Sequence, residues 1–522
     1  MKRRAKSIMF LGTGSDVGKS VLAAALCRVL KQDGYRVAPF KAQNMALNSF
    51  VTSDGGEMGR AQVVQAEAAG VEPHVDMNPI LLKPTSQVGS QVIVLGRPIG
   101  NMTAKEYYRY KKQLITVVRE AYERLAQAYD VIVLEGAGSA VELNLKEHDI
   151  VNLFMAKMVN SPCILVGDID RGGIFASLLG SLALMEPDER DLIAGMVVNK
   201  FRGDPDLFQS GVKILENLSG KPVLGVVPYF SHIQIHEEDS VALSRRRMNK
   251  GNENTEDEEI SIGILRLPYI SNYTDFDALE NEPNVRVVYF DRPEDVFSFD
   301  AIIIPGSKNT IEDLAILHRR GLVDALRAFV KAGRVLVGIC GGYQMLGKYV
   351  RDEESVESAL TEIEGIGVIP MVTEMFKEKI TYQVEALPNP DHPLWETLVD
   401  ARSSVPTLAG YEIHMGRGFA LNDKMKPLFN IKRIGTSPDS MHPDGFIGDV
   451  GECWGTYIHG IFDNDYFRKW FLKRIAIKRG KQLPKSENGI EFLKWKDQQY
   501  NLLADHFRRY VDVNRIYEII GL

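Results

Sequence analysis

The chain has 522 residues, so it should contain more than one hydrophobic core, because domains usually hold about 100 to 200 residues. Its composition, 45% hydrophobic and 25% charged, is typical of globular proteins and excludes disordered, collagenous and coiled-coil chains. Acidic residues outnumber basic ones by 69 to 62, and the formal charge of -7 gives no basic field that would favour nucleic acid as a partner.

The four cysteines, Cys27, Cys163, Cys340 and Cys453, lie far apart and form no CxxC pair. This spacing argues against a disulfide framework or a structural zinc site and fits a reducing cytosol. The basic start of the chain is followed by apolar residues for only one strand length, and no run approaches the roughly 20 apolar residues of a membrane-spanning helix. We therefore expect a soluble, cytoplasmic protein without a membrane partner.

Short β-rich runs alternate with helical patterns in the first half of the chain, which predicts a doubly wound, mostly parallel sheet. The clearest helix covers residues 21–30, where apolar side chains recur at helical spacing and Gly34 follows as a stop signal. The expected strands are residues 7–11, 37–40, 131–134, 164–167, 194–198 and 223–227.

A second α/β domain is expected after residues 244–259, a strongly polar stretch that we interpret as a linker. Past residue 479 the chain becomes charged and helical, with an apolar stripe that favours a docked helix. The predicted fold class is α/β, with two doubly wound, mostly parallel-sheet domains, 1–243 and 260–479, and a helical C-terminal extension, 480–522. The expected strands of the second domain are 260–265, 285–290, 301–304, 335–339 and 456–458; the stripe consists of Phe492, Trp495, Tyr500, Leu503 and Phe507.

A glycine-rich loop, residues 12–20, follows the first expected strand and opens a helix, as a phosphate-binding loop does. Its glycines let backbone amides surround phosphate oxygens, Lys19 adds a full positive charge, and the Ser20 hydroxyl suits Mg²⁺. The match is a variant, because Thr13 stands where the strict GxxxxGK[ST] pattern has glycine.

This loop resembles that of the dethiobiotin synthetase-like ATPases, which use ATP to phosphorylate a carboxylate. The resemblance implies ATP contacts through Gly14, Val17, Gly18, Lys19, Ser20 and Asn199, with Asn199 at the adenine. It also implies Ser20, Asp54 and Glu135 as Mg²⁺ ligands. Glu135 ends a buried strand, where ligands collect in open α/β sheets, although a carboxylate there can also simply cap the next helix.

Asp168, Asp170 and Arg171 end another expected strand and are followed by two glycines. Two carboxylates beside an arginine suit a metal ion, an activated substrate or a capped turn before the next helix. We favour a role on the substrate side.

An apolar strand, residues 335–339, runs into Gly338-Ile339-Cys340-Gly341-Gly342 and then into a helix, which is the nucleophile-elbow arrangement. Small residues on both sides allow a sharp turn, and the helix N-terminus favours the Cys340 thiolate. Neighbouring backbone amides can stabilise an oxyanion. The other three cysteines are interpreted as core residues.

The surroundings of Cys340 resemble class I, triad-type glutamine amidotransferases. The resemblance implies His459 as the general base, backbone amides of Gly306, Ser307 and Gly341 as the oxyanion hole, and Gln344 and Glu412 as glutamine-binding candidates. The usual acidic residue two positions after the histidine is replaced by Ile461. Either the site is a Cys-His dyad, or an acid such as Glu412 or Asp463 orients His459; we predict the dyad.

An ATP-dependent carboxylate-activating domain joined to an ammonia-releasing domain implies amidation of a carboxylic acid through an acyl phosphate. Long strings at residues 38–48, 57–62, 78–84, 168–173, 199–204 and 410–416 resemble the cobyric acid synthase family, over almost the whole chain. That family lacks the usual acid after the histidine, and its substrate is a corrinoid, adenosylcobyrinic acid a,c-diamide, amidated on the b, d, e and g carboxylates. The substrate-side candidates are Lys41, Gln43, Asn44, Asn48, Asp168, Asp170 and Arg171, with a solvated loop as the alternative for the amides.

Two other functions remain open from the sequence. The a,c-diamide synthase has the same domain order and acts on fewer carboxylates. A partition-type ATPase switch would carry a non-catalytic second domain, and glutaminase activity would separate it from both enzymes.

Overall fold

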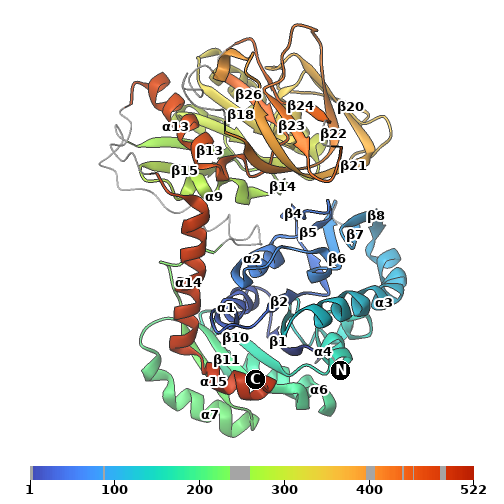
Figure 1. Cartoon of the computed structure of the whole chain (residues 1–522), viewed down its shortest axis with the longest axis vertical. Helices are drawn as coiled ribbons and strands as arrows, with labels where there is room; N and C mark the ends of the chain where they lie inside the picture. Colours follow the sequence, from blue (N-terminus) through green and yellow to red (C-terminus); the bar gives the residue numbers. More distant parts are fainter. Residues whose placement is uncertain are drawn as a thin grey trace. The chain divides into compact units, whose positions relative to one another are not determined.

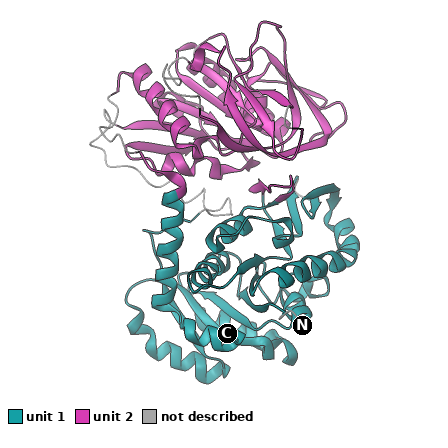
Figure 2. Cartoon of the chain, in the orientation of Figure 1, with its two compact units in different colours: residues 1–46, 58–236, 494–522 teal, residues 47–57, 237–493 magenta. Residues whose placement is uncertain are grey.

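The computed structural model describes residues 4–85, 89–235, 259–395, 406–437, 440–450, 452–481 and 489–522. The chain forms two compact units, shown in different colours in Figure 2. Unit 1 comprises residues 1–46, 58–236 and 494–522, and unit 2 comprises residues 47–57 and 237–493. The units therefore interleave along the chain, which a division into consecutive domains does not anticipate. Residues 244–258 of the expected linker lie outside the described part of the chain.

Unit 1 is built on a six-stranded parallel sheet in the order β12-β11-β10-β1-β9-β2. All six strands expected from the sequence are confirmed. The strands are buried because helices cover the sheet, as their continuous apolar runs predict. Their bounds are β1 Lys6–Gly12, β2 Val37–Phe40, β9 Val131–Glu135, β10 Cys163–Asp168, β11 Ile193–Phe201 and β12 Val223–Pro228.

The helices of unit 1 include α1, Lys19–Gln32, which packs against α2 and against β1, β2 and β9 (Figure 1). The long α3 begins with a capping box in which Thr103 and Glu106 satisfy each other's backbone amides. A smaller sheet, β3-β6-β7-β8, lies in the same unit. The remaining bounds are α2 Arg60–Ala69, α3 Ala104–Ala128, α4 Leu153–Val159, α5 Ile174–Leu184, α6 Pro187–Leu192, α7 Gln209–Ser219, β3 Gln43–Met45, β6 Ile80–Pro84, β7 Gly89–Val94, β8 Arg97–Thr103, η1 Val75–Met77, η2 Leu143–His148 and η3 Pro205–Phe208.

The C-terminal helices complete the core of unit 1. Tyr500, Leu503 and Phe507 of α14, Phe492–Tyr510, join the same hydrophobic cluster as α1 and β1, which confirms these three residues of the expected stripe; Phe492 belongs to unit 2, and Trp495 is only half-buried. Arg28 of α1, whose side chain is buried, donates to Asp497 at 2.7 Å. The final helix, α15, spans Val513–Ile520.

Unit 2 contains a six-stranded sheet in the order β15-β13-β16-β18-β26-β25, parallel except for β25. Four of its expected strands are confirmed. The fifth was misplaced: β26 ends at Thr456, because the Tyr457 amide leaves the ladder and donates to the Asp444 carboxylate at 3.0 Å. The bounds are β13 Ile260–Leu265, β15 Val285–Phe290, β16 Ala301–Ile304, β18 Val335–Ile339, β25 Phe446–Ile447 and β26 Glu452–Thr456.

A second, mostly antiparallel sheet of unit 2, in the order β20-β19-β21-β23-β24 with β22 paired to β21, was not expected. It adds to the predicted α/β class without changing it. Its strands are β19 Tyr349–Arg351, β20 Glu362–Glu364, β21 Met371–Pro388, β22 Leu408–Ala420, β23 Phe429–Arg433 and β24 Met441–Asp444; the other elements of the unit are β4 Ser49–Val51, β14 Ile270–Ser271, β17 Gly306–Ser307, α9 Asp277–Glu280, α10 Thr310–Arg319, α11 Leu322–Lys331, α12 Gly341–Leu346, α13 Asp465–Arg479, η4 Tyr273–Phe276, η5 Pro293–Ser298, η6 Pro393–Trp395 and η7 Ile461–Asp463. The short β5, Glu57–Gly59, pairs with β4. Within the described residues, no helix combines the length and apolarity needed to cross a bilayer.

Candidate active sites

The glycine-rich loop of unit 1 lies between β1 and α1, where the sequence places it. Lys19 is buried and its ammonium donates to the carbonyl oxygens of Gly14, at 2.8 Å, and Gly138, at 3.0 Å. Gly18 has a φ of 98°, a left-handed conformation that suits glycine, and directly precedes α1. The lysine thus lies folded over the loop with its charge at the point where phosphate oxygens would enter.

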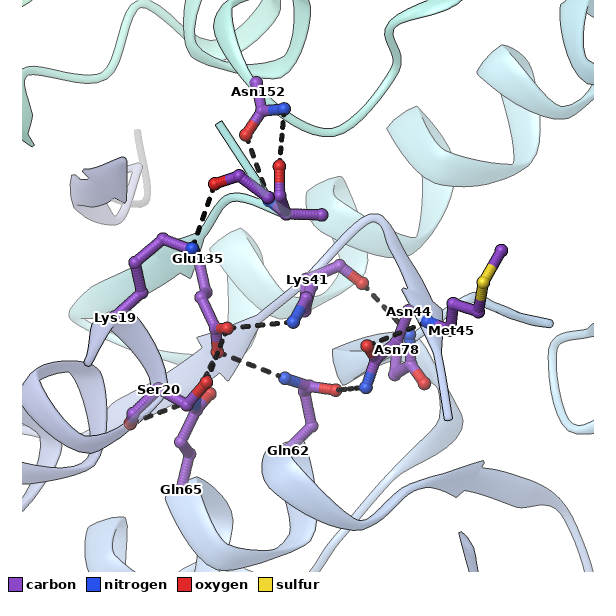
Figure 3. A network of polar contacts seen from close by, with 12 residues as sticks. Lys19, Ser20, Lys41, Asn44, Met45, Gln62, Gln65, Asn78, Glu135 and Asn152 are labelled. Atoms are coloured by element: carbon purple, nitrogen blue, oxygen red, sulfur yellow. Dashed lines mark hydrogen bonds and ion pairs between the residues drawn. The ribbon is translucent and has the colours of Figure 1, made fainter. Parts of the chain in front are cut away.

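Glu135 ends β9 and is the centre of a buried polar network (Figure 3). It accepts hydrogen bonds from the Ser20 hydroxyl at 2.8 Å, the Lys41 ammonium at 2.8 Å and the Gln65 amide at 2.6 Å. Burial alone would raise the pKa of this carboxyl, but Lys41 and the other donors hold it below its usual value. Glu135 is therefore a buried carboxylate, kept charged by the groups around it.

Two of the three residues expected to ligate Mg²⁺, Ser20 and Glu135, are in contact. Ser20 and Glu135 share a hydrogen bond in unit 1, whereas Asp54 belongs to unit 2 and accepts from the Thr52 hydroxyl. Among the described residues, no group of three or more His, Cys, Asp or Glu side chains could hold a metal ion. Two hard oxygens still fit Mg²⁺, because this ion usually takes one or two protein ligands and completes its shell with water and phosphate oxygens.

Asn199, an expected ATP contact, and the substrate-side candidates Asp168 and Arg171 have partners in or beside the same loop. The Asn199 amide donates to the carbonyl of Val17 at 2.8 Å, so it supports the loop itself. Asp168 is paired with Lys200 at 3.1 Å, and the Lys200 ammonium also donates to the carbonyl of Asp16 in the loop. Further pairs join Arg171 to Asp16, at 3.3 Å, and Asp170 to Arg202, at 2.5 Å.

Two of the predicted substrate-side amides are held by neighbouring side chains. Gln43 accepts from the Tyr107 hydroxyl at 2.6 Å, and Asn44 donates to Gln62 at 3.0 Å. Gln62 in turn donates to Glu135 at 3.4 Å, which connects Asn44 with the carboxylate network. Asn48 belongs to unit 2.

In unit 2, Cys340 follows β18 and caps α12, as the elbow motif predicts. Its backbone has φ 51° and ψ -110°, an unfavourable conformation for a residue with a side chain, of the kind that functional sites retain. Side chains are excluded at both flanking glycines, because a Cβ on Gly338 would lie 2.6 Å from the Tyr343 backbone and one on Gly342 2.0 Å from the Ile304 carbonyl oxygen. Glycine at positions 338 and 342 therefore makes this turn sterically possible.

His459 is fully buried and bonded to a carboxylate that the sequence analysis missed. Its Nδ1 lies 2.6 Å from Oδ2 of Asp275, and the other oxygen of Asp275 accepts from the Gly460 amide at 3.1 Å. Burial favours the neutral imidazole, but the charges of Asp275 and Cys340 raise the pKa of His459 to about 10. Its Nε2 has no hydrogen-bond partner in the described part of the chain, which leaves this atom available to a substrate.

The predicted Cys-His dyad is therefore wrong, and so are both acids considered as its alternative. Glu412 instead accepts from Arg433 at 2.7 Å and from His414 at 3.3 Å, and these partners overcome burial to lower its pKa to about 2. The acid at Nδ1 of His459 is Asp275 of η4, not Glu412 or Asp463. It is separated from the histidine by most of unit 2 in sequence, so proximity along the chain could not reveal it.

The backbone expected to bind an oxyanion lies next to these side chains. A Cβ on Gly306 would lie 3.3 Å from Cε1 of His459, and one on Gly341 would lie 2.7 Å from the Ser307 amide nitrogen. The Ser307 hydroxyl donates to Asp313 at 2.6 Å, which fixes this loop. Gln344 accepts from Thr310 at 2.9 Å.

Two family models match the chain. Residues 8–241 match a CobQ/CobB/MinD/ParA nucleotide binding domain, and residues 261–467 match a CobB/CobQ-like glutamine amidotransferase domain. A cobyric acid synthase of Syntrophobacter fumaroxidans is 63% identical over 519 residues, 99% of each chain. One of Moorella thermoacetica is 46% identical over 522 residues, 99% of this chain and 98% of that one.

The chain belongs to the cobyric acid synthase family. It is a glutamine-hydrolysing amide synthase of cobalamin biosynthesis, as the sequence analysis predicts. The full-length likeness favours this function over an a,c-diamide synthase, and the glutamine amidotransferase domain argues against a switch protein with an inert second domain.

Asp275→Asn should impair glutamine hydrolysis, because it removes the charge that stabilises the His459 imidazolium. Activity that depends on a thiolate beside this imidazolium persists below the pKa of His459, about 10, and is lost as the pH rises through it. In the variant this pKa falls, so the alkaline limb of kcat/KM moves to lower pH. We expect kcat near neutral pH to fall roughly 100-fold or more, about 2.7 kcal/mol in barrier.

A matched control is Asp300→Asn, which changes another buried aspartate of unit 2 whose partners are Ser261, Arg479 and Lys481. It should leave the glutaminase pH profile unchanged. If Asp275→Asn kept kcat within about tenfold and left the alkaline limb in place, a dyad would suffice and the assignment of Asp275 would be wrong.

Proposed function

We propose that this chain amidates the b, d, e and g carboxylates of adenosylcobyrinic acid a,c-diamide to give cobyric acid, using ATP and ammonia released from glutamine. The observation that supports it is the presence, in one chain of this family, of a loop site around Lys19 and Glu135 and of a Cys340 elbow with a carboxylate-bound His459. We place the reaction in the cytoplasm, where ATP is available and the thiols stay reduced.

The glutaminase reaction begins when the Cys340 thiolate attacks the side-chain amide carbon of glutamine. The backbone of Gly306, Ser307 and Gly341 stabilises the oxyanion, and His459 gives its proton to the departing ammonia. Water then attacks the thioester with His459 as base, releasing glutamate and restoring the thiol. Asp275 holds the imidazole throughout and stabilises its protonated form.

The synthetase reaction transfers the γ-phosphoryl group of ATP to a corrinoid carboxylate, giving ADP and an acyl phosphate. Ammonia then displaces phosphate and forms the amide. The loop amides and Lys19 bind the phosphates, and Lys41 adds a second cation beside Glu135. Ser20 and Glu135 would hold Mg²⁺, which neutralises phosphate charge when bound.

We propose Asp168, Asp170 and Arg171, with Gln43 and Asn44, as the substrate side of this site, and Gln344 and Glu412 as groups that bind glutamine. Support comes from Arg171, which pairs with the loop residue Asp16, and from Asp168, which pairs with Arg171 and Lys200; Asp170 pairs with Arg202. Asp54 remains a candidate metal ligand and Asn199 a candidate adenine contact.

The whole reaction can be tested by mass spectrometry of cobyrinic acid a,c-diamide, in its adenosylated form, incubated with the protein, MgATP and glutamine. We expect four successive replacements of a carboxylate hydroxyl by an amino group, and none when ATP is omitted. A product series that stops before the fourth amide would point to a different member of this enzyme group.

Lys19→Ala and Glu135→Gln should abolish corrinoid amidation with glutamine and with ammonium alike, because carboxylate activation precedes nitrogen attack. The matched control is Lys146→Ala, which removes a partly exposed lysine of the same unit whose partners are Glu186 and Glu189. It should leave amidation unchanged. Near-normal amidation by either loop-site variant would remove the ATP-site assignment.

Cys340→Ala should lose glutamine-dependent amidation and keep ammonium-dependent amidation at high ammonium, because the synthetase site is untouched. Cys453→Ala is the control: this thiol lies in the neighbouring strand β26, and burial raises its pKa, so it is not a nucleophile. It should keep both activities. Loss of both activities in a folded Cys340→Ala protein would contradict the assignment of glutamine hydrolysis to the Cys340 site and of amidation to the loop site.

A further inference from the structure

Residues 47–57 connect β3 to β5 and fall within the range matched by the nucleotide binding domain. By their contacts they nevertheless belong to unit 2, and Figure 2 colours them accordingly. Their strand β4 contacts β21 and β22 of the antiparallel sheet. A segment that the sequence assigns to the nucleotide-binding part is thus packed as part of the glutaminase unit.

The first residues of this segment hold the loop that carries Asp275. Asn48 accepts a hydrogen bond from the Tyr273 amide at 3.3 Å, and the Ser49 amide donates to Asn272 at 2.9 Å. Asn272 is the capping residue immediately before η4, and Asp275 lies within that single turn. Asn48, Ser49 and Asn272 are all buried, so water cannot replace these bonds without opening the packing.

Residues 47–57 also contact Tyr411, whose ring is stacked on His459. The Tyr411 ring lies stacked on the His459 imidazole, with centroids 5.2 Å apart, and the two backbones exchange hydrogen bonds at 2.9 and 3.2 Å. The Tyr411 hydroxyl donates to the carbonyl of Ser49 at 3.3 Å, and Phe50 meets the Tyr411 ring edge-on at 5.1 Å. Val51 packs on Tyr411 as well.

The remainder of the segment is anchored to β21. The Thr381 hydroxyl donates to the carbonyl of Gly55 at 2.9 Å, and Gln383 donates to the carbonyl of Val51. Glu57 is paired with Lys379, and both side chains are buried. Gly55 has a φ of 77° and approaches Thr381 so closely that a Cβ would lie 3.0 Å from its carbonyl oxygen, which selects glycine here.

We propose that residues 47–57 complete the glutaminase centre, with Asn48 as a positioning residue that holds the Asp275 turn against His459. The proposal rests on the glutaminase part of the proposed function. It gives Asn48 a different role from the substrate contact expected from the sequence. Asn48 acts through Asp275 and does not touch glutamine.

The test measures glutamine hydrolysis by the full chain without ATP or corrinoid. Asn48→Leu keeps the approximate volume and removes the acceptor, so kcat should fall roughly 10-fold or more while KM for glutamine stays within about threefold. Asn48→Asp keeps an acceptor oxygen and should recover most of kcat. Asn389→Leu is the control, since this asparagine of unit 2 is also buried and its side chain accepts from the Asp391 amide and donates to the carbonyl of Pro427, not to the turn that carries Asp275.

A double variant shows whether Asn48 works through the carboxylate. If it does, adding Asn48→Leu to Asp275→Asn should change kcat by less than about twofold, because the interaction it supports is already lost. Multiplicative losses in the double variant would overturn the proposal. Should Asn48→Leu fail to fold, Asn272→Gly tests the same junction, because it keeps the left-handed backbone and removes the acceptor of the Ser49 amide; unchanged kcat in this variant would likewise overturn the proposal.

Ammonium-dependent amidation separates the remaining outcomes. Asn48→Leu should keep it, whereas a substrate contact would lose it and leave glutamine hydrolysis intact, which would overturn the proposal. If the wild-type protein amidated the corrinoid with neither nitrogen source, the proposed synthetase function would fail, while the glutaminase comparison of the Asn48 variants would still decide the present inference.

Discussion

A buried imidazole loses its proton unless a negative charge faces it, and the glutaminase centre is arranged around this constraint. His459 has been withdrawn from water almost completely, and Asp275 at 2.6 Å compensates for the lost hydration. The second oxygen of Asp275 is bonded to the Gly460 amide, so the carboxylate fixes both the ring and the backbone next to it. Without this contact, burial would favour the neutral form of His459.

The site at the glycine-rich loop of unit 1 shows the converse case, a buried carboxylate that stays ionised. Glu135 is kept ionised by Lys41 and by hydroxyl and amide donors from Ser20, Gln62 and Gln65. The Glu135 carboxylate has little freedom to rotate, because its oxygens already accept hydrogen bonds from side chains of α1 and α2. Ser20 and Glu135 therefore present oxygens whose orientation is already fixed, and Lys19 is held at the neighbouring glycine-rich loop.

The sequence predicted those parts of both sites that are local in the chain. Lys19, Ser20 and Cys340 lie at strand-to-helix turns, and the steric requirement for glycine beside them makes the motifs visible. Glu135 was found because it ends a buried strand. The acid of the glutaminase site was missed because it was sought within a few residues of His459 or in a recognised string, whereas it follows β13 through an irregular connection.

One signal for Asp275 was present in the sequence. The strands β13 and β18 are parallel members of one sheet, so the chain that leaves each of them starts from the same edge. The stretch 272–277, Asn-Tyr-Thr-Asp-Phe-Asp, follows β13 at this edge and combines carboxylates with aromatic residues. A carboxylate that follows the carboxyl end of a buried strand is therefore a signal that Asp275 shares with Glu135.

The domain boundaries expected from the sequence did not assign residues 47–57 to unit 2, for a different physical reason. Division by composition assumes that consecutive residues share a core, but β4 is too short to have a core of its own and takes its packing from β21 and β22. Its apolar residues Phe50 and Val51 pack on Tyr411, and its backbone bonds to the side chains of Gln383 and Asn272. The chain on either side of this segment continues into β3 and α2 of unit 1, whereas its contacts with the turn that carries Asp275 are hydrogen bonds within unit 2. Two buried hydrogen bonds, made by Asn48 and Ser49, therefore connect this short segment to the turn whose carboxylate faces His459.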